Sequence, residues 1–430
     1  MFFSFIAIVL LLYFLAKSPE KCLTLVFIWY PTLTILPVCR GVNVSTLFIY
    51  LLFVCTLYKE GKKPFLSFPF LLPFVICMSS YFISAVLGYK IALSVARWVE
   101  QYFLVWTIWA LFKPTKNNIY FLFYSLMVYL LVLDVYAMFE SVSVWNPFLD
   151  YLRHSGIGIP QQPATYVRYG LYRSQSLTFW TSIMAVASGL GDVFLAYSFF
   201  SKQLKPSPLL YVTWICCLIG VFISGTRSVM LVTAIASFCF LKNVINVKYI
   251  IIIGVFAFVS ISLTGDFFSE VLNSFVNVED VGGSSVDQRG LQFLVAYKYW
   301  MNAPFVGNGL DYTDFLVSEN VGLLGAESIV FRLLIDRGLV GFLSFFFLYF
   351  YSCMRLSKMG YASFVFILLG FCFGKIVSLL YTLEEAYVFA YVVFLMKIIN
   401  EKRLQALKAY LYRRYYSSNL AKREGMQLAK

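Results

Sequence analysis

The arginines of this chain are its best candidates for functional residues, because of where they occur in the sequence. The chain divides into apolar segments joined by short connections, and two long connections interrupt the series at about 141–175 and 265–326. One set of connections, which includes both long ones, carries mostly arginine as its cation: Arg40, Arg153, Arg168, Arg173, Arg227, Arg289, Arg332 and Arg337, with Lys90 and Lys298. A planar guanidinium can bind two phosphate oxygens at once. This placement therefore predicts recognition of a phosphate.

The other set of connections carries mostly lysine, and the difference predicts which side of a membrane each set faces. Its cations are Lys17, Lys21, Lys59, Lys62, Lys63, Lys113, Lys116, Lys202, Lys205, Lys242, Lys248, Arg355 and Lys358. Short loops rich in positive charge lie on the cytoplasmic side of a membrane. The arginine-bearing connections then lie outside, against that rule, and binding of an anion would explain why positive charge lies on that side.

Membrane-spanning helices are the elements that must position these arginines. Of 430 residues, 61% are hydrophobic and 13% charged, about half the charged share of an average soluble domain. A helix of about 20 apolar residues crosses a bilayer, so we predict an all-α polytopic membrane protein of about 12–14 transmembrane helices. Thirteen spans are predicted: 2–16, 22–38, 44–58, 70–88, 91–112, 118–140, 176–199, 208–223, 228–242, 249–264, 338–354, 361–381 and 384–399.

One membrane domain, residues 1–400, and a basic tail, residues 401–430, are predicted. With the amino terminus outside, every lysine connection and the tail fall inside, and both long loops fall outside. The net charge of +13 therefore arises from the inner loops and the tail and does not indicate a nucleic-acid partner. The tail suits either a helix on an anionic lipid surface or a solvated segment that fixes the topology. The apolar start lacks a basic region, which predicts a first span instead of a signal peptide.

The segment Ser224-Gly225-Thr226-Arg227-Ser228 joins two predicted spans on the outer side. A charge between two apolar helices is costly unless it has a partner or a function. Two interpretations remain open. The small neighbours either admit a ligand to Arg227 or form a tight turn from which the arginine reaches lipid headgroups.

The second long loop contains two predicted helices separated by a turn. Ser285 or Asp287 can cap a helix over 288–301, and Pro304 with Gly307-Asn308-Gly309 ends it. Apolar residues then recur at helical spacing over 326–336.

Three further arginines accompany these helices. Arg332 and Asp336 are four residues apart on one helical face, so an ion pair between them is the alternative to ligand binding. Arg289 has only Asp287 nearby and is the better ligand candidate, while Arg337 directly precedes the next span. Within the spans, Arg97 and Glu100 are three residues apart and are expected to neutralise each other.

Carboxylates are the candidate acid–base groups, because His154 is the only histidine. Glu327 opens the helix that leads into the next span; it is either a catalytic base or an acid that complements the helix dipole. No Asp-x-Asp pair occurs, which argues against a divalent cation that bridges pyrophosphate to the protein. The nine cysteines lie in spans or at their rims, so neither a metal site nor a disulfide framework is predicted.

Three of these segments resemble sequence blocks of the O-antigen polymerase and O-antigen ligase superfamily. They are Ser224–Ser228, the run from Arg289 through Trp300 to Pro304-Phe305-Val306-Gly307-Asn308-Gly309-Leu310, and Glu327–Gly341. The likeness covers about residues 170–345 by motif, and nearly the whole chain by span count and by the position of two outer loops. Ligases of this superfamily typically carry a histidine where the third block begins. Here Glu327 stands there, which favours a polymerase.

The resemblance implies a metal-independent, inverting glycosyltransferase of the bacterial inner membrane that needs no cofactor. It would join undecaprenyl-pyrophosphate-linked oligosaccharides on the periplasmic face, with a chain-length regulator protein as a partner. The charge of the pyrophosphate leaving group must then be met by fixed cations. The residues that the resemblance and the arginine pattern offer for this are Arg173, Arg227, Arg289, Arg332 and Arg337. Glu327 would take the proton of the attacking hydroxyl, and Arg289 would act beside it in catalysis.

Two alternatives to a polymerase remain. A ligase would use the same donor but transfer it to lipid A–core. A flippase or other transporter would move the lipid-linked oligosaccharide intact. Transporters of this size tend to show internal symmetry and charged or broken helices at the membrane midplane. The predicted spans hold few unpaired charges while the outer loops hold the arginines, so we favour an enzyme.

Overall fold

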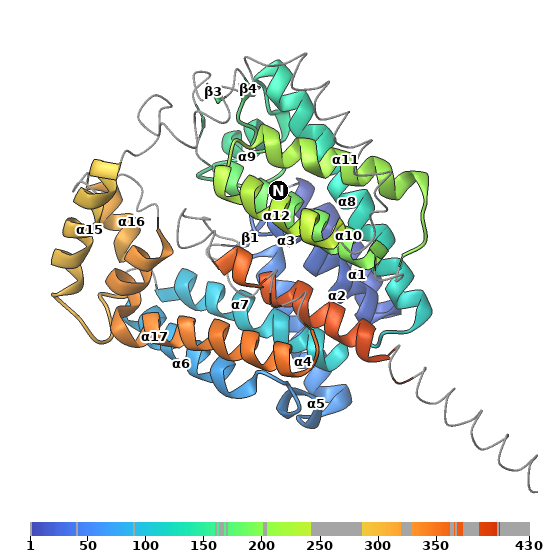
Figure 1. The fold of residues 1–430 in the computed structure, drawn as a ribbon, viewed down its shortest axis with the longest axis horizontal. Helices are drawn as coiled ribbons and strands as arrows, with labels where there is room; N and C mark the ends of the chain where they lie inside the picture. The colour runs from blue at the N-terminus through green and yellow to red at the C-terminus, as the bar shows by residue number, and fades with distance from the viewer. Residues whose placement is uncertain are drawn as a thin grey trace, which may run out of the picture.

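The computed structural model describes residues 2–39, 42–88, 91–159, 161–162, 167–168, 171–200, 204–241, 286–319, 328–361, 365, 368–372, 387–401 and 404. Most of them are helical (Figure 1). The helices are α1 (Phe2–Lys17), α2 (Pro19–Ile28), α3 (Tyr30–Leu33), α4 (Val44–Glu60), α5 (Lys63–Leu66), α6 (Leu71–Leu87), α7 (Ile91–Leu111), α8 (Lys116–Ser143), α9 (Pro147–His154), α10 (Thr181–Phe200), α11 (Pro208–Ile223), α12 (Arg227–Leu241), α15 (Val286–Trp300), α16 (Tyr312–Ser318) and α17 (Ile329–Lys358), followed by a helical segment over 387–401.

The strands are short and form two antiparallel pairs. β1 (Pro37–Cys39) pairs with β2 (Val42–Asn43), and β3 (Val167–Arg168) pairs with β4 (Leu171–Tyr172). Within the described ranges, α8, α10 and α17 are long and apolar enough to cross a membrane, and α1, α6 and α11 are shorter apolar helices. The predicted all-α polytopic membrane architecture is confirmed. The predicted span 249–264 and most of 361–381 lie outside the described residues.

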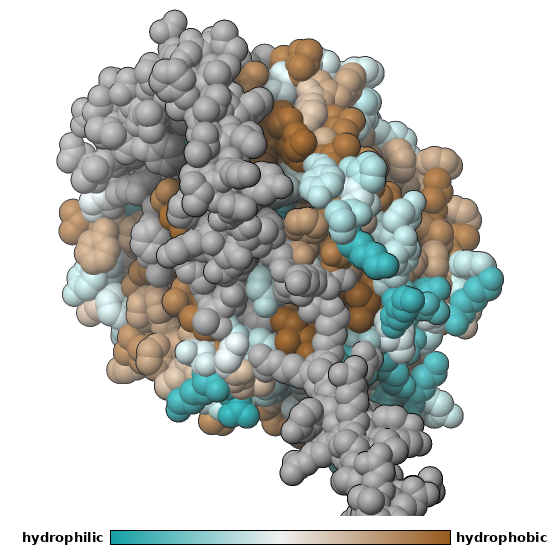
Figure 2. Space-filling view, turned by 45° about the vertical axis from the view of Figure 1, so that its right-hand side comes forward, coloured by the Kyte–Doolittle hydropathy of each residue, from teal (hydrophilic) through white to brown (hydrophobic). Residues whose placement is uncertain are grey.

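Apolar side chains on the outside of the bundle suit a lipid environment. α1 exposes Phe2 and Phe5, and α17 exposes Leu343 and Phe350, each by more than half of its surface. Figure 2 shows brown, apolar residues spread over the face in view, while the most hydrophilic residues gather mainly in its lower half. Soluble monomers rarely expose apolar surface of this extent.

The bundle consists of two packed groups of helices. α4, α6, α7 and α17 pack in one group, and α8, α10, α11 and α12 pack in the other. α1 contacts α4, and α2 contacts both α4 and α8. Figure 1 shows the second group above the first. The two groups are therefore joined partly by helices from the beginning of the chain.

The helical segment 387–401 forms the centre of the bundle. Residues 387–396 are all buried, and the segment lies near the middle of Figure 1, in red. Its aromatic rings contact rings from several helices: Phe27 of α2, Phe194 of α10 and Tyr349 of α17, with Phe70 and Phe112. Hydrophobic residues on all sides of a helix are typical of such a buried position.

The predicted span 22–38 is not one helix. α2 ends at Ile28, and the short α3 and strand β1 follow. Pro31 has no backbone N–H to donate to the carbonyl four residues earlier, and its ring clashes with that carbonyl. The chain therefore breaks at Trp29, whose dihedral angles (φ −85°, ψ 5°) are not helical.

α17 is broken at Gly338, and the turn over 304–310 fills the break. Gly338 has φ 61° and ψ −166°, a conformation essentially restricted to glycine. The carbonyls of Ile335 and Asp336 accept from the N–H groups of Asn308 and Gly309 at 2.9 and 3.0 Å. Beyond the break, the N–H groups of Leu339 and Val340 donate to the carbonyls of residues 304 and 305 at 2.8 and 3.0 Å. The backbone groups freed by the break thus find new partners.

The same turn is tied to the end of α6. The N–H of Leu310 donates to the carbonyl of Ser84 at 2.9 Å. A Cβ atom at Gly309 would lie 2.5 Å from the carbonyl oxygen of Leu87, and one at Gly307 would lie 2.4 Å from the carbonyl of Asp336. The predicted Gly307-Asn308-Gly309 turn is confirmed, and close backbone approach explains its glycines.

Gly338→Ala should destabilise the protein by about 1–3 kcal/mol or more, because alanine is strained at this conformation and its Cβ would lie 2.4 Å from the carbonyl oxygen of Phe305. Thermal unfolding of the detergent-solubilised protein measures the effect. Gly290→Ala on α15 is the control, since nothing lies within 4 Å of its Cβ position; it should be neutral or stabilising by about 0.5–1 kcal/mol. Equal unfolding midpoints for both variants would contradict the strain at the break.

Candidate functional site

The turn between α11 and α12 carries Arg227 and is buried. α11 ends at Ile223 and α12 begins at Arg227, so only three residues connect them. Gly225 has φ 63°, and the Ser224 hydroxyl accepts from the N–H of Thr226 at 3.2 Å. Ser224 and Thr226 are buried, and Arg227 is half-buried in the first turn of α12. The predicted tight turn is present, but another part of the chain covers it.

Arg173 is the residue that crosses this turn. Its Nε donates to the carbonyl of Ser224 at 2.8 Å, and its Nη2 donates to the hydroxyl of Thr181 at 3.4 Å. The structure thus brings Arg173, from the first long loop, to the turn that carries Arg227. Two residues of the predicted phosphate-binding set are thus connected through this turn, although 51 positions separate Arg173 from Ser224.

A buried carboxylate anchors the segment that follows Arg173. Glu140, at the end of α8, accepts from the hydroxyl of Ser174 and from the N–H of Ser176, both at 2.6 Å. Asn146 donates its side-chain amide to the carbonyl of Ser176 at 2.8 Å. Burial, with the nearby Glu140 charge as a second cause, raises the pKa of the Tyr172 hydroxyl. Arg173 therefore lies between strand β4 and a segment that is hydrogen-bonded to Glu140 of α8.

A second group of charged residues lies where α16 meets α17. Arg332 forms an ion pair with Asp314 of α16. Asp336 accepts from both the N–H and the hydroxyl of Thr313, at 2.7 and 2.6 Å. Arg332 interacts electrostatically with Asp336, as their spacing on one helical face suggested. Both residues also make contacts to α16, because α16 packs against the face of α17 that bears them.

Arg97 of α7 belongs to the same region. It pairs with Asp311, which precedes α16 with φ 66°. Glu100 accepts from the hydroxyls of Ser45 and Thr46 on α4. Arg97 also interacts electrostatically with Glu100. The expected neutralisation within this pair is therefore shared with further partners, Asp311 for Arg97 and the hydroxyls of α4 for Glu100.

Arg337 is buried against α6. Only 4% of it is exposed. Its Nη2 donates to the carbonyl of Cys77 at 3.4 Å, and its guanidinium lies 5.0 Å from the ring centroid of Tyr81. A cation over an aromatic face is attracted by the ring quadrupole. These contacts hold α17 to α6 directly before the break at Gly338.

Two predicted site residues fall outside this description. Glu327 lies outside the described residues, and the helix that it was predicted to open begins at Ile329 with Ser328 as its N-cap. The backbone of Arg289 lies on α15, which agrees with the predicted helix over 288–301, but its side chain is not described. No group of three potential metal ligands occurs in the parts of the chain that the structure describes.

Sequence reasoning missed the acids that position these arginines. Glu140, Asp311 and Asp314 were not predicted to hold a site together. Glu140 offered one usable signal, because an ionisable residue near the end of an apolar span is costly without a role. Asp311 and Asp314 gave none, since Arg97 lies 214 positions from Asp311, and Arg332 lies 18 positions from Asp314 on a separate helix.

Comparison with known proteins gives one match. Residues 212–346 match the family model described as O-antigen ligase. No curated protein matches the chain. The matched residues include the turn that carries Arg227, the turn over 304–310 and the break in α17.

Glu140→Gln should loosen the segment that follows Arg173. Ser174 and Ser176 both donate to the same oxygen, Oε2. The amide removes the negative charge that strengthens these two bonds and puts an N–H₂ group in the place of a buried acceptor, at a cost of about 1–3 kcal/mol. Faster hydrogen–deuterium exchange over residues 173–178 is the expected result. Glu60→Gln, which alters the partly exposed partner of Lys113, is the control and should leave that exchange unchanged. Unchanged exchange in both variants would show that Glu140 does not anchor the segment.

Proposed function

We propose that this bacterial membrane protein is a polysaccharide polymerase of the O-antigen polymerase and ligase superfamily. It joins undecaprenyl-pyrophosphate-linked oligosaccharide repeat units on the periplasmic face of the inner membrane. The match of residues 212–346 to the family model described as O-antigen ligase supports the superfamily. The finer assignment to a polymerase is supported by Glu327, which stands where ligases of the superfamily typically carry a histidine.

The contact of Arg173 with the turn that carries Arg227 is the observation on which this proposal mainly rests. Arg173 comes from the first long loop and Arg227 from the start of α12, and the contact of Arg173 with Ser224 ties the two elements together. The N-terminus of a helix adds positive potential to the side chain of Arg227. A pyrophosphate oxygen near this turn would be attracted by Arg173, by Arg227 and by the N-terminus of α12.

The second group supplies the remaining predicted phosphate ligands. Arg332 and Arg337 lie on the first half of α17, and Arg289 lies on α15, which packs against α17. Arg332 is 17% exposed in its side chain and is held by Asp314. In the proposed arrangement Arg289 and Arg332 bind the leaving group. Arg337 keeps α17 and α6 together and adds its positive charge from a buried position.

The proposed reaction is a single inverting displacement. The hydroxyl oxygen of the acceptor sugar attacks the anomeric carbon of the donor sugar, and the bond from that carbon to the pyrophosphate oxygen breaks. The carboxylate of Glu327 takes the hydroxyl proton. The negative charge that develops on the departing undecaprenyl pyrophosphate is stabilised by fixed guanidinium groups, and Arg289 acts beside Glu327. Orientation of two lipid-linked substrates lowers the entropic part of the barrier. A chain-length regulator is the protein partner in this proposal.

A gel of surface polysaccharide from cells that lack this gene tests the proposal. A polymerase predicts loss of long chains with a single core-plus-one-repeat band remaining, and restoration by the wild-type gene. Loss of every repeat, with undecaprenyl-linked polymer accumulating, would indicate a ligase instead. Repeat units trapped on the cytoplasmic face would indicate a flippase, and an unchanged ladder would exclude all three.

Arg227→Ala and Arg173→Ala should each lower polymer synthesis by about 100-fold, the usual cost of removing one group that stabilises charge in a transition state. Chain length and amount in the complemented deletion strain are the measurement. Arg173→Lys should recover only part of the loss, because lysine cannot form the two-point contact.

Arg355→Ala provides the matched control for these variants. Arg355 is exposed at the opposite end of α17 from Arg332 and Arg337, and its loss should leave the ladder unchanged at equal protein level. If Arg227→Ala and Arg173→Ala also left polymer length and amount intact, the proposed pyrophosphate clamp would be wrong.

A further inference from the structure

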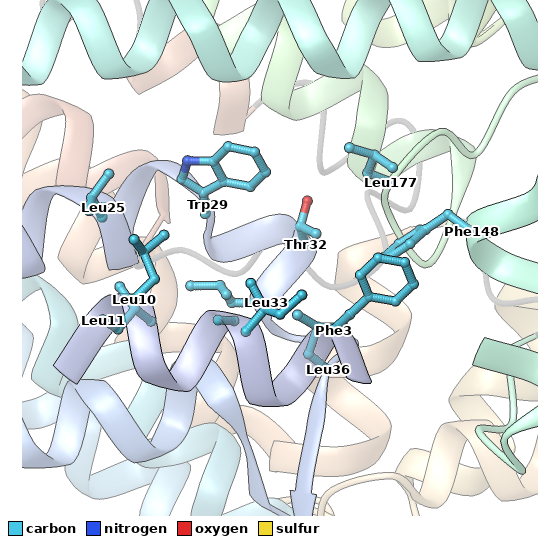
Figure 3. Close-up of a pocket in the computed structure, with 12 residues that line it drawn as sticks. Phe3, Leu10, Leu11, Leu25, Trp29, Thr32, Leu33, Leu36, Phe148 and Leu177 are labelled. Carbon is cyan, nitrogen blue, oxygen red and sulfur yellow. The ribbon is translucent and has the colours of Figure 1, made fainter. Parts of the chain in front are cut away.

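An apolar cavity of about 310 Å³ lies between α1 and the helices α2, α3 and α9 (Figure 3). Five of its lining residues come from α1, and the others come mainly from α2, α3 and the chain that links and follows them. Thr32 is the polar member of the lining, and its hydroxyl lies 3.3 Å from that of Tyr129. Water needs two to four polar partners to occupy a cavity, so this wall does not suit ordered water.

The cavity opens toward the lipid-facing surface. Ile6 and Leu10 line it and are 47% and 51% exposed. On the same helix, Phe5 and Val9 are also at least half exposed and do not line the cavity. The outer wall is thus a single helix with bilayer on its far side. A molecule that enters from the membrane meets mainly apolar side chains.

The shape suits the end of one hydrocarbon chain. The lining runs along α1 from Phe3 to Leu11, about 12 Å at 1.5 Å per helical residue. The volume lies at the lower end of the range of ligand pockets, about 300–1,000 Å³, and admits a short length of straight chain. A sugar would bring hydroxyl groups that this wall cannot satisfy.

One end of the cavity is formed in part by α9, which carries an arginine. Figure 3 shows Phe3, Phe148 and Leu177 at one end and Leu10, Leu11 and Leu25 at the other. Leu177 follows Ser176 on the segment that Glu140 anchors, and Phe148 lies on α9. α9 also carries Arg153, whose Nη1 pairs with Asp150 at 2.6 Å and whose Nη2 donates to the side chain of Gln175 at 3.0 Å. A headgroup phosphate at this end would compete with Asp150 for Arg153.

We propose that this cavity binds one acyl chain of a bilayer phospholipid, with the phosphate toward Arg153 and the chain along α1. Bilayer phospholipid surrounds α1, so its concentration at the opening exceeds that of any lipid-linked sugar. A straight chain also fits a short cavity better than a polyprenyl chain, which carries methyl branches. Through Leu177, the bound chain packs against the segment that follows Arg173. The proposal does not depend on the proposed function.

Photocrosslinking in vesicles tests the proposal with the full-length protein. The vesicles contain phosphatidylethanolamine and phosphatidylglycerol, with a fraction of phospholipid that carries a diazirine near the end of one acyl chain. After irradiation, mass spectrometry locates the adducts. We expect adducts on Leu11, Leu25 and Leu33, which face the cavity and are less exposed than the outer residues of α1.

Leu10→Trp and Leu12→Trp form a matched pair of variants. Both leucines lie on α1 and are 51% and 46% exposed, but only Leu10 lines the cavity. Because both sites are at the surface, both variants should fold, which size-exclusion chromatography checks. Leu10→Trp should fill the cavity and abolish the inner adducts, whereas Leu12→Trp should keep them.

Three results would overturn the proposal. Adducts confined to outer residues such as Phe5 and Val9 would indicate bulk bilayer contact only. Inner adducts that persist in Leu10→Trp would place the chain elsewhere. Loss of the inner adducts on addition of a small mole fraction of undecaprenyl phosphate would assign the cavity to a polyprenyl chain instead of phospholipid.

Discussion

The backbone hydrogen bonds between the 304–310 turn and the break in α17 are the constraint on which the arrangement of charged residues depends. A broken helix in a membrane protein exposes N–H and C=O groups that hydrocarbon cannot satisfy. Here four such groups around Gly338 are paired with the turn. The first half of α17, with Arg332, Asp336 and Arg337, is thereby fixed beside α6 and α16 and does not continue as one straight helix.

Several acidic residues in the described part of the chain position arginines or the segments that carry them. Asp314 holds Arg332, Asp311 holds Arg97, and Glu140 holds the segment next to Arg173. A guanidinium on a long side chain loses conformational entropy when it binds. Holding it beforehand on a carboxylate or a carbonyl reduces that loss at the moment of ligand binding. The partner carboxylates also lower the net charge that a cluster of arginines would otherwise place in a medium of low dielectric constant.

Local sequence patterns predicted the helices and turns that depend on residues close together in the chain. The helix over 288–301, the turn at Gly307-Asn308-Gly309 and most of the described spans follow from apolar periodicity, caps and glycines, and they agree with α15, the 304–310 turn and the helices found. The break at Trp29 was predictable in principle, because Pro31 cannot continue a helix. The span assignment failed there because an apolar run alone does not report a break.

The full pairing of charges could not be read from the chain. Arg97 and Asp311 are 214 positions apart, so their contact depends on how α7 and α16 pack. The nearer pairs, Arg97 with Glu100 and Arg332 with Asp336, had the right spacing for contact on one helix. A helical spacing brings two side chains to one face, and packing against α4 and α16 gave each acid further donors.

The buried helix over 387–401 also bears on the order of assembly. A ribosome delivers this segment after α2, α10 and α17, all of which it contacts. Until it arrives, the aromatic rings that will surround it have only lipid or one another as neighbours. The earlier helices can therefore insert, but they cannot reach their final packing. Tight packing of the bundle therefore waits for its innermost segment, and the earlier helices keep unfilled contacts until that segment is inserted.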